Sequence, residues 1–407
     1  QPDDAAGGNV NNVILQMHIT NQSTGNPFLT QVKLDFISFK NITFQESDSS
    51  LHIVGSTFVR VSNSSFNPNV NEFLVEGCNF KGSAPYGTEN GILFAAQPPI
   101  DVTIRGNTFS RLLYGIYKAG GITQGTLTIE ENKFLAGWRT TSGSGNALGG
   151  QIQVTGQHLI IRKNLIDFEG SFNSGYRGIY IDIPTGTESI VIEQNTLRGS
   201  VRDGIYLWGF IGGFCDSVVI ANNMININGS IGLSVAQSNG NVKILFNTIR
   251  LSGAGLESLR LHSPNCVVLN NIILGKVTGG GGFNVCYHQG NAQSPNLLSD
   301  YNVLYMPGST ALVIRDGVAY PTLGAYRTAT GLDTNSISKN IDFIDSVGLH
   351  ISDCQAQDPD LKGIPVPEIS VDIDDEIRST TTPMIGADEN SFTGYQMFTD
   401  PYKAELT

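Results

Sequence analysis

Apolar and polar residues alternate in short runs along most of this 407-residue chain. Many runs lead into one phrase: two alternating β-branched residues, a polar pair, an asparagine, any residue and a large apolar residue. The phrase reads VTIRGNTF around Asn107 and LTIEENKF around Asn132. A period of two places Val and Ile on one face of a strand and polar residues on the other. The pattern therefore predicts short β-strands, because a helix cannot use this spacing.

The asparagine of this phrase returns at intervals of 24 to 32 residues. A repeat of this length, built of short strands and polar turns, indicates a solenoid. Because asparagine tolerates left-handed backbone angles and hydrogen-bonds locally, we expect these residues to form tight corners and a stacked side-chain ladder. The apolar residue that follows should point inward and stack on its counterpart in the next coil. The predicted ladder consists of Asn107, Asn132, Asn164, Asn195, Asn223, Asn247, Asn271 and Asn302.

Degenerate copies of the phrase precede this ladder. They keep the large apolar residue, as Phe44, Phe58, Phe66 and Phe80. Small or polar residues stand at the asparagine position, among them Ser56, Ser64 and Cys78.

A second phrase, Gly-Ile-Tyr or Gly-Leu-Ser, begins at Gly115, Gly178, Gly204 and Gly232. We expect each glycine to make a bend, and Ile116, Ile179, Ile205 and Leu233 to face inward. The next residues, Tyr117, Tyr180, Tyr206 and Ser234, should then face outward. Two repeated phrases in each turn require at least two strand faces per coil. The prediction is an all-β parallel β-helix.

Composition agrees with this class. The chain has 47 Gly, 40% apolar residues and only 15% charged residues, which excludes a disordered chain and a helical protein. The net charge of −12 comes without any basic stripe, so no nucleic-acid partner is expected. No stretch approaches the roughly 18 apolar residues of a membrane span. The five cysteines show no metal-ligand spacing and are predicted to be small buried hydrophobes.

The chain resembles the right-handed parallel β-helix (pectate-lyase-like) superfamily, through the repeat over residues 10–320 and through the segment that follows it. That closing segment includes LGAYRTATGLDTNSI (323–337), VDIDDEIR (371–378) and MIGADE (384–389). Its order is similar to the closing segment of large secreted surface β-helix proteins of Bacteroidota and related environmental bacteria. The resemblance implies an extracellular or cell-surface protein.

Four regions are predicted: a flexible N-terminus (1–9), the solenoid (10–320), a C-terminal capping segment (321–389) and a tail or linker (390–407). Helical spacing of Leu323, Tyr326 and Ala329 predicts a short helix over Thr322–Thr330. The start at Gln1 suggests a processed or truncated product. Strand-like sequence begins without a capping helix, so either an upstream cap has been lost or a partner covers the open edge.

Enzymes of the resembled fold act on polysaccharides along the outer face of the coils. Glycoside hydrolysis needs two carboxylates that flank a cleft. The only Asp-Asp pairs, Asp3–Asp4 and Asp374–Asp375, lie outside the predicted coils.

The best remaining constellation lies between residues 176 and 262. Exposed aromatic rings stack on sugars, and arginine binds carboxylates in a bidentate manner. The predicted ligand-binding residues are Tyr176, Arg177, Tyr180, Tyr206 and Trp208. If the chain is an enzyme, the catalytic candidates are Arg260, His262, Asp182 and Arg202. Three interpretations stay open: ordinary strand residues, glycan binding without turnover, and catalysis.

Other candidates for chemistry are weaker. The acidic run Asp372, Asp374, Asp375 and Glu376 offers oxygen ligands for a structural Ca²⁺ but lacks the spacing of an EF-hand, so a structural role beside Arg378 is favoured. No other cofactor is expected. Scattered histidines, including His288 and His350, are predicted to be structural. The glycine run 279–282 has no following helix that would make it a phosphate-binding loop.

The leading hypothesis is a secreted, non-enzymatic β-helix with a structural or adhesive role. Its expected partners are a second copy of itself, joined through open solenoid edges, or a surface polysaccharide. The alternative is a polysaccharide lyase or glycoside hydrolase that acts at the face of coils 176–262.

Overall fold

The computed structural model describes residues 13–17, 28–32, 37–46, 56–62, 72–82, 90–95, 101–119, 125–135, 150–168, 176–209, 215–236, 240–253, 257–277, 285–290, 296–344 and 348–390. Several predicted features lie outside the described residues: Asp3–Asp4, the N-terminus 1–9, Ser64, Phe66, the glycine run 279–282 and the tail beyond Asn390.

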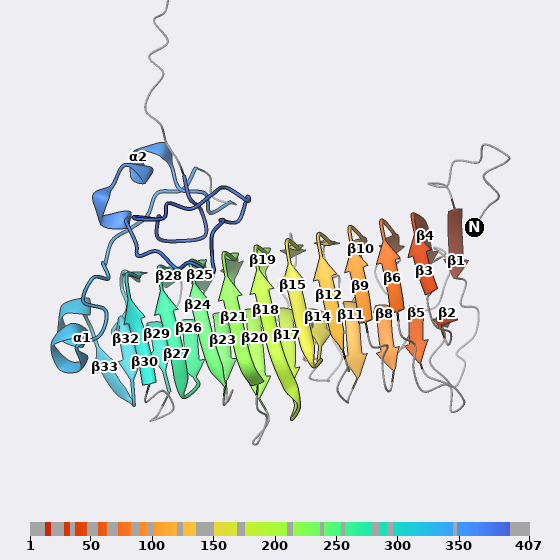
Figure 1. Cartoon of the computed structure of the whole chain (residues 1–407), viewed down its shortest axis with the longest axis horizontal. Coiled ribbons are helices and arrows are strands. Elements are labelled where there is room, and N and C mark those ends of the chain that lie inside the picture. Colours follow the sequence, from red (N-terminus) through yellow and green to blue (C-terminus); the bar gives the residue numbers. More distant parts are fainter. Residues whose placement is uncertain are drawn as a thin grey trace, which may run out of the picture.

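Three parallel sheets run along the molecule, and each coil adds one strand to each of them (Figure 1). Sheet A contains β1 (Val13–Met17), β4 (Ile42–Glu46), β7 (Asn79–Lys81), β10 (Thr108–Ser110), β13 (Lys133–Leu135), β16 (Leu165–Phe168), β19 (Thr196–Ser200), β22 (Met224–Asn228), β25 (Thr248–Gly253), β28 (Ile272–Val277) and β31 (Val303–Tyr305). Sheet B contains β2 (Phe28–Val32), β5 (Thr57–Ser62), β8 (Asn90–Ala95), β11 (Tyr114–Ala119), β14 (Gly150–Val154), β17 (Arg177–Ile183), β20 (Asp203–Gly209), β23 (Ile231–Ala236), β26 (Glu257–His262), β29 (Val285–Gln289), β32 (Val313–Arg315) and β33 (Val318–Tyr320). Sheet C contains β3 (Ile37–Lys40), β6 (Glu72–Glu76), β9 (Asp101–Arg105), β12 (Thr126–Glu130), β15 (His158–Arg162), β18 (Thr187–Glu193), β21 (Cys215–Ala221), β24 (Asn241–Leu245), β27 (Asn265–Leu269) and β30 (Asn296–Asp300).

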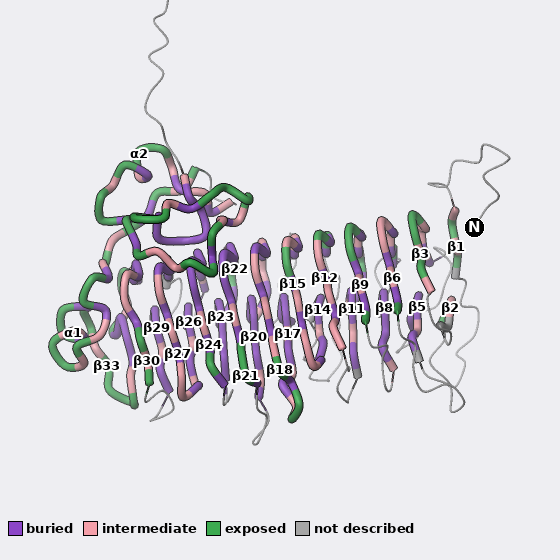
Figure 2. The backbone as a smooth tube through the Cα atoms, in the orientation of Figure 1, coloured by how far each residue is buried: buried purple, intermediate pink, exposed green. Residues whose placement is uncertain are grey.

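This arrangement confirms the predicted all-β parallel β-helix. Each sheet contributes more than one row of inward-facing side chains to a continuous buried core, for example Val102 and Ile104 in sheet C. Buried positions recur in successive strands along the solenoid (Figure 2). The rings of Phe44, Phe80, Phe109 and Phe134 stack nearly parallel, with centroids 4.9, 4.7 and 4.8 Å apart. These distances equal the spacing of neighbouring strands, so identical residues in register pack on one another without a gap. The predicted inward stack is confirmed.

The asparagine ladder is also present, at the corner between sheets C and A. The backbone N–H and the side-chain amide of Asn107 both donate to Oδ1 of Asn132, at 3.0 and 2.9 Å. The same pair of bonds links each later asparagine to the next as far as Asn302. Cys78 N–H donates to Asn107 at one end, and Asn302 donates to Ser336 and Asp333 at the other.

One detail of the predicted corner is wrong. The residue with positive φ is the one before each ladder asparagine, as in Glu131 at 58° and Lys163 at 55°. This left-handed residue turns the chain, and the turn directs the following asparagine inward, where a buried amide needs partners on the neighbouring coils. The prediction assigned both the backbone turn and the ladder hydrogen bonds to the asparagine. In the fold, the residue before it makes the turn and the asparagine makes the hydrogen bonds.

The glycines of the second phrase do not make bends. They lie within strands of sheet B, and none of them has a positive φ. A Cβ on Gly204 would stand 2.5 Å from the carbonyl oxygen of Gly232 and 2.8 Å from Ile225 Cγ2. Glycine is therefore required because sheets A and B approach closely at this point.

The residues after these glycines have the predicted orientation but not all are exposed. Ile116, Ile179, Ile205 and Leu233 are fully buried in the core, as expected. On the outer side, Tyr117 and Tyr180 keep partial exposure. Tyr206 and Ser234 are buried there, with 7% and 0% of their surface exposed.

A short helix closes the last coil. The helix α1 (Leu323–Thr330) follows the antiparallel hairpin β32–β33 and packs Leu323 and Tyr326 into the main core. The Thr322 side chain caps its first turn, and Gly331, with a φ of 72°, ends it. The predicted helix and its capping role are confirmed.

The rest of the closing segment lies along the side of the solenoid instead of over its end, above the corner between sheets C and A (Figure 1). It contains only the short helices α2 (Asp353–Ala356) and η3 (Pro359–Leu361). Between residues 364 and 375 it runs back toward the N-terminal coils. Left-handed corner residues hold it, because Asn270 donates to the Ile364 carbonyl at 2.8 Å and Asn222 to the Val371 carbonyl at 2.8 Å.

Four of the five cysteines are buried, as predicted: Cys78, Cys215, Cys266 and Cys286. Cys354 is exposed. Across the described ranges, no helix is long and apolar enough to cross a membrane.

Candidate functional site

The predicted site residues come together on the outer face of sheet B, on strands β17, β20, β23, β26 and β29. Parallel register aligns them in rows that cross the strands. One row is Tyr180, Tyr206, Ser234, Arg260 and His288. A second row is Asp182, Trp208, Ala236 and His262, and a third is Arg177, Asp203, Ile231 and Glu257.

An aromatic cluster forms one half of this face. The ring of Tyr206 lies 5.9 Å from Tyr180 and stacks on Trp208 at 6.2 Å with an interplanar angle of 15°. The Arg177 guanidinium lies 4.4 Å from the centroid of Tyr180 and 4.3 Å from that of Tyr206, within the range of a cation–π contact. Burial raises the pKa of both tyrosines, so they stay protonated at neutral pH. Trp208 and Tyr180 remain partly exposed.

A buried ion pair fixes this cluster from below. Asp203 is fully buried, and its Oδ2 accepts from Arg177 Nε at 2.9 Å and from Arg202 Nη2 at 2.8 Å. Arg177 itself is only 4% exposed. A buried carboxylate is stable only when it is paired, and here two guanidinium groups share it. Arg177 is therefore buried and supports the two tyrosine rings.

Tyr176 is likewise no part of an exposed platform. Its side chain is buried, and its carbonyl oxygen accepts from the backbone N–H groups of Arg202 and Asp203. It joins two coils at the edge of the sheet.

A second cluster of charged residues and histidines forms the other half of the face. Glu257 accepts a bidentate pair of bonds from Arg260, one of them from Nη2 at 2.7 Å, and a further bond from His288 Nδ1 at 3.1 Å. Burial acts to raise the pKa of Glu257, but Arg260 and His288 outweigh it and hold this pKa at about 2. Glu257 is therefore ionised at neutral pH and positions the two groups beside it.

His262 borders this second cluster. Its ring meets that of His288 edge-on, with centroids 5.7 Å apart. Burial, together with the nearby His288 and Arg260, lowers the pKa of His262. Its imidazole is thus neutral at pH 7, and Nε2 has no hydrogen-bond partner in the described part of the chain. A Cβ on Gly290 would come within 2.7 Å of this ring, so glycine leaves room for it.

The two acid–base candidates Asp182 and His262 are not brought together. They stand at the ends of one row, three strands apart, which corresponds to about 14 Å. Asp182 and Glu257 are also three strands apart and in different rows. Glycosidase mechanisms place their two carboxyl groups about 5–10 Å apart, so this pair does not have that geometry.

Sequence reasoning missed the part played by His288. It was predicted to be a structural residue, yet it completes the Glu257 cluster. The signal is its register: His288 stands directly beside Arg260 in the neighbouring strand, which can be inferred only once the length of each coil is known.

The acidic run of the closing segment serves mainly to shape a turn. Asp372 is buried, and its Oδ1 accepts from the backbone N–H groups of Asp374 and Glu376. Arg378 pairs with Glu389 at 3.2 Å instead of with this run. His350, Asp374 and Asp388 place possible metal-binding atoms within 4.8 Å of one another. His350 already hydrogen-bonds Asp374 at 2.8 Å, which accounts for their proximity without an ion.

No protein-family model, no curated protein and no solved structure matches this chain.

Proposed function

We propose that the protein is an extracellular member of the pectate-lyase-like superfamily that binds a polysaccharide on the outer face of sheet B without cleaving it. Its role would be structural or adhesive, at the surface of a bacterium related to those named above. The supporting observation is that buried ion pairs hold the exposed groups of this face in place. The buried carboxylates of Asp203 and Glu257 form these ion pairs. The partly exposed groups beside them are Trp208, Tyr180, Arg260 and His262. Side chains held in place before binding lose little conformational entropy when a ligand arrives.

The residue types suit a sugar chain. Partly exposed aromatic rings offer flat surfaces to sugar faces, and a guanidinium can bind a hydroxyl or carboxylate. The row from Tyr180 to His288 extends across the five strands β17 to β29, or about 19 Å from the first to the last, which is enough for several sugar units.

Calorimetric titration tests this proposal with polygalacturonate, alginate and neutral dextran. Saturable binding to at least one polymer is expected. Trp208→Ala should weaken it about tenfold, or about 1.4 kcal/mol, because a stacking surface is lost. Leu298→Ala, which removes an exposed apolar side chain from sheet C, is the matched control and should change nothing. Absence of binding to all three polymers would refute the proposal.

A second candidate is elimination on a uronate polymer, with His262 as the base. It is favoured by one observation, the neutral His262 beside the permanently charged Arg260. Release of unsaturated products, followed by ultraviolet absorbance and abolished in His262→Ala, would replace binding without turnover by this activity.

Self-association is a further part of the proposed structural role. Strands β1, β2 and β3 form the first edge of the three sheets, and no described strand pairs with them on the outer side. Ile14 and Phe28 on these strands are 55% and 41% exposed. Exposed apolar edge strands favour pairing with another chain. Light scattering should show association that Ile14→Lys reduces and Leu298→Lys leaves intact; a monomer at all concentrations would refute it.

A further inference from the structure

Three side chains of the closing segment, His350, Asp374 and Asp388, place possible metal ligands side by side. One nitrogen or oxygen atom of each lies within 4.8 Å of the other two. Oδ2 of Asp374 accepts a hydrogen bond from Nε2 of His350 at 2.8 Å, which explains why these two are close but not why Asp388 faces them. Two neighbouring ligands of one ion, each with a bond of about 2.1 Å, stand about 3 Å apart, so this spacing also suits a shared ion.

Asp388 is the residue that points to a ligand. Only 6% of its surface is exposed. Its Oδ2 accepts from the backbone N–H of Ile351 at 2.7 Å, whereas its Oδ1 accepts no hydrogen bond from any described residue. A buried carboxylate is stable when donors or a cation compensate it, and a cation shared with His350 and Asp374 would complete this compensation.

The residue that precedes each of these three side chains holds it in position. Leu349 and Ala387 form a buried cluster with Met224 of β22, and Ile373 packs against it. The backbone N–H of Ile373 also donates to the Ala387 carbonyl at 3.1 Å. The three backbone positions are therefore fixed relative to one another before an ion arrives, and a site of this kind loses little conformational entropy on binding.

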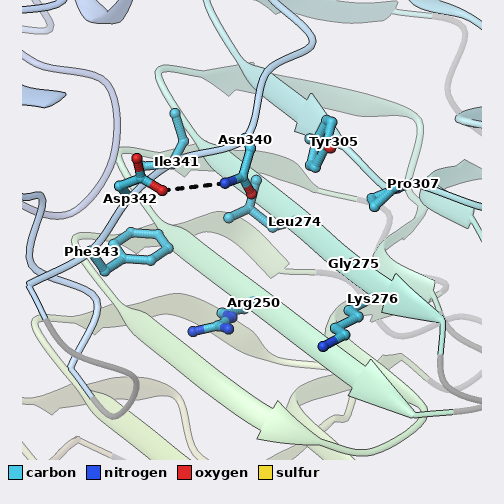
Figure 3. Close-up of a pocket in the computed structure, with 10 residues that line it drawn as sticks. All are labelled: Arg250, Leu274, Gly275, Lys276, Tyr305, Pro307, Asn340, Ile341, Asp342 and Phe343. Atoms are coloured by element: carbon cyan, nitrogen blue, oxygen red, sulfur yellow. Dashed lines mark hydrogen bonds between the residues drawn. The ribbon is translucent and has the colours of Figure 1, made fainter.

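A cleft of about 510 Å³ lies between sheet A and the closing segment (Figure 3). Strands β25, β28 and β31 form one wall, and residues 340–343 form the other. Phe343 lines this cleft and also packs against the cluster of Leu349 and Ala387. Because the cleft reduces the contact of the closing segment with the solenoid, cross-links within the segment contribute more to its local stability.

The ligand types indicate which ion would bind. One imidazole with two carboxylates suits a divalent ion of the first transition row, whereas Ca²⁺ takes oxygen ligands. The predicted Ca²⁺ ligand Asp372 is already used, since its carboxylate accepts from the backbone N–H groups of Asp374, Glu376 and Glu389. The side chains of His350 and Asp374 are 41% and 53% exposed, so an ion can enter and water can complete its coordination.

We infer that His350, Asp374 and Asp388 bind one divalent transition-metal ion, such as Zn²⁺, which joins three parts of the closing segment. The role of the ion would be structural. This segment contains only the short helices α2 and η3, and small structures with little regular backbone bonding are often stabilised by a metal. The inference does not depend on the function proposed for the face of sheet B.

Calorimetric titration and thermal unfolding of the full chain, after treatment with a chelator, test this inference with Zn²⁺. One ion should bind per chain and raise the unfolding temperature by about 3 °C when free Zn²⁺ exceeds its Kd about a hundredfold. His350→Gln and Asp388→Asn should each weaken Zn²⁺ binding at least about tenfold. Asp388→Asn should keep its fold without metal, because it replaces a buried charge by a neutral group of the same size, so its loss of binding cannot be attributed to unfolding.

His158→Gln is the matched control. The side chain of His158 is 37% exposed and lies 3.4 Å from Glu188, but no third metal ligand joins this pair among the described residues. The control should bind Zn²⁺ as the wild type does. Zn²⁺ should also slow hydrogen exchange in residues 349–352 and 371–378 but not in the distant strands β8 and β11.

Three results would overturn the inference: no saturable Zn²⁺ binding, unchanged binding in Asp388→Asn, or an equal loss in His158→Gln. Tighter binding of Ca²⁺ than of Zn²⁺ would overturn the assignment to a transition metal.

Discussion

The asparagine ladder makes a quantitative prediction at Asn195. This side chain is fully buried, and its Oδ1 accepts from the backbone N–H and the amide of Asn164 at 3.0 and 2.9 Å. Its own amide donates to Asn223 Oδ1 at 3.0 Å and to the Ile161 carbonyl at 2.8 Å. Its amide also donates to the Glu193 carbonyl at 3.0 Å, so Asn195→Ala removes five bonds.

The loss of stability follows from the hydrogen-bonding groups that lose Asn195 as a partner. The backbone N–H of Asn164 loses its acceptor in the core, and an unsatisfied buried donor costs about 1–3 kcal/mol. The amide of Asn164 and Oδ1 of Asn223 keep other partners, so each loses only the net value of one bond, about 1 kcal/mol. We expect Asn195→Ala to lower the free energy of unfolding by about 3–5 kcal/mol.

Urea denaturation followed by circular dichroism gives this number, and native-state hydrogen exchange should show faster exchange of the Asn164 amide. Asn265→Ala is the matched control, because its side chain accepts a bond from Asn296 in an exposed position. That variant should lose less than about 1 kcal/mol. An equal loss of unfolding free energy in the two variants would refute the view that the ladder is stabilising because it is buried.

Other substitutions test packing and charge. Gly204→Ala should lower the melting temperature, because its Cβ would stand 2.5 Å from a carbonyl oxygen of the next coil. Gly324→Ala in α1 meets no atom closer than 4.0 Å, so it should raise the free energy of unfolding by about 0.5–1 kcal/mol. Glu257 has a pKa lowered to about 2 in the fold, so it contributes stability above its unfolded pKa near 4.5 that is lost as pH falls toward 2; acid titration of Glu257→Gln should lack this loss. Asp388 has a pKa raised to about 6, chiefly by burial, so its ionisation weakens the fold above pH 6, and Asp388→Asn should raise the melting temperature at pH 8 more than at pH 4. An Asp388→Asn effect that is equal at both pH values would contradict this reasoning.

The repeat could be predicted from sequence because it has two periods, one of two residues within a strand and one of a whole coil. Each period indicates a different set of contacts. Alternation within a run fixed which residues face inward, and the return of asparagine fixed which coils lie in register. The left-handed angle was assigned to the wrong residue because sequence shows that a corner exists, but not which of two adjacent residues turns the backbone. Glu131 and Phe246 occupy that position although neither residue type favours it, since tertiary contacts of the ladder outweigh local preference.

The site could be predicted only in part. Alternation placed Tyr206 on the outer side, but it carries no information on what covers that side, so the burial of this ring was missed. Asp182 and His262 were both catalytic candidates, but the number of coils between them places them about 14 Å apart. The cleft of Figure 3 could not be predicted, because its two walls are more than thirty residues apart in the chain and meet only when the closing segment folds back.

The return of the closing segment also constrains the number of coils. A ladder of identical corners can be lengthened or shortened by whole coils, because every rung offers the same bonds to the next. The closing segment cannot follow such a change, since it is tied to individual corners: Asp375 to Lys163, Val371 to Asn222 and Ile364 to Asn270. Each added coil between Lys163 and Asn270 would displace these anchors by about 4.8 Å, whereas one added before Asn132 would leave them in place. The solenoid should therefore tolerate changes in length during evolution at its N-terminal end and resist them beneath the closing segment.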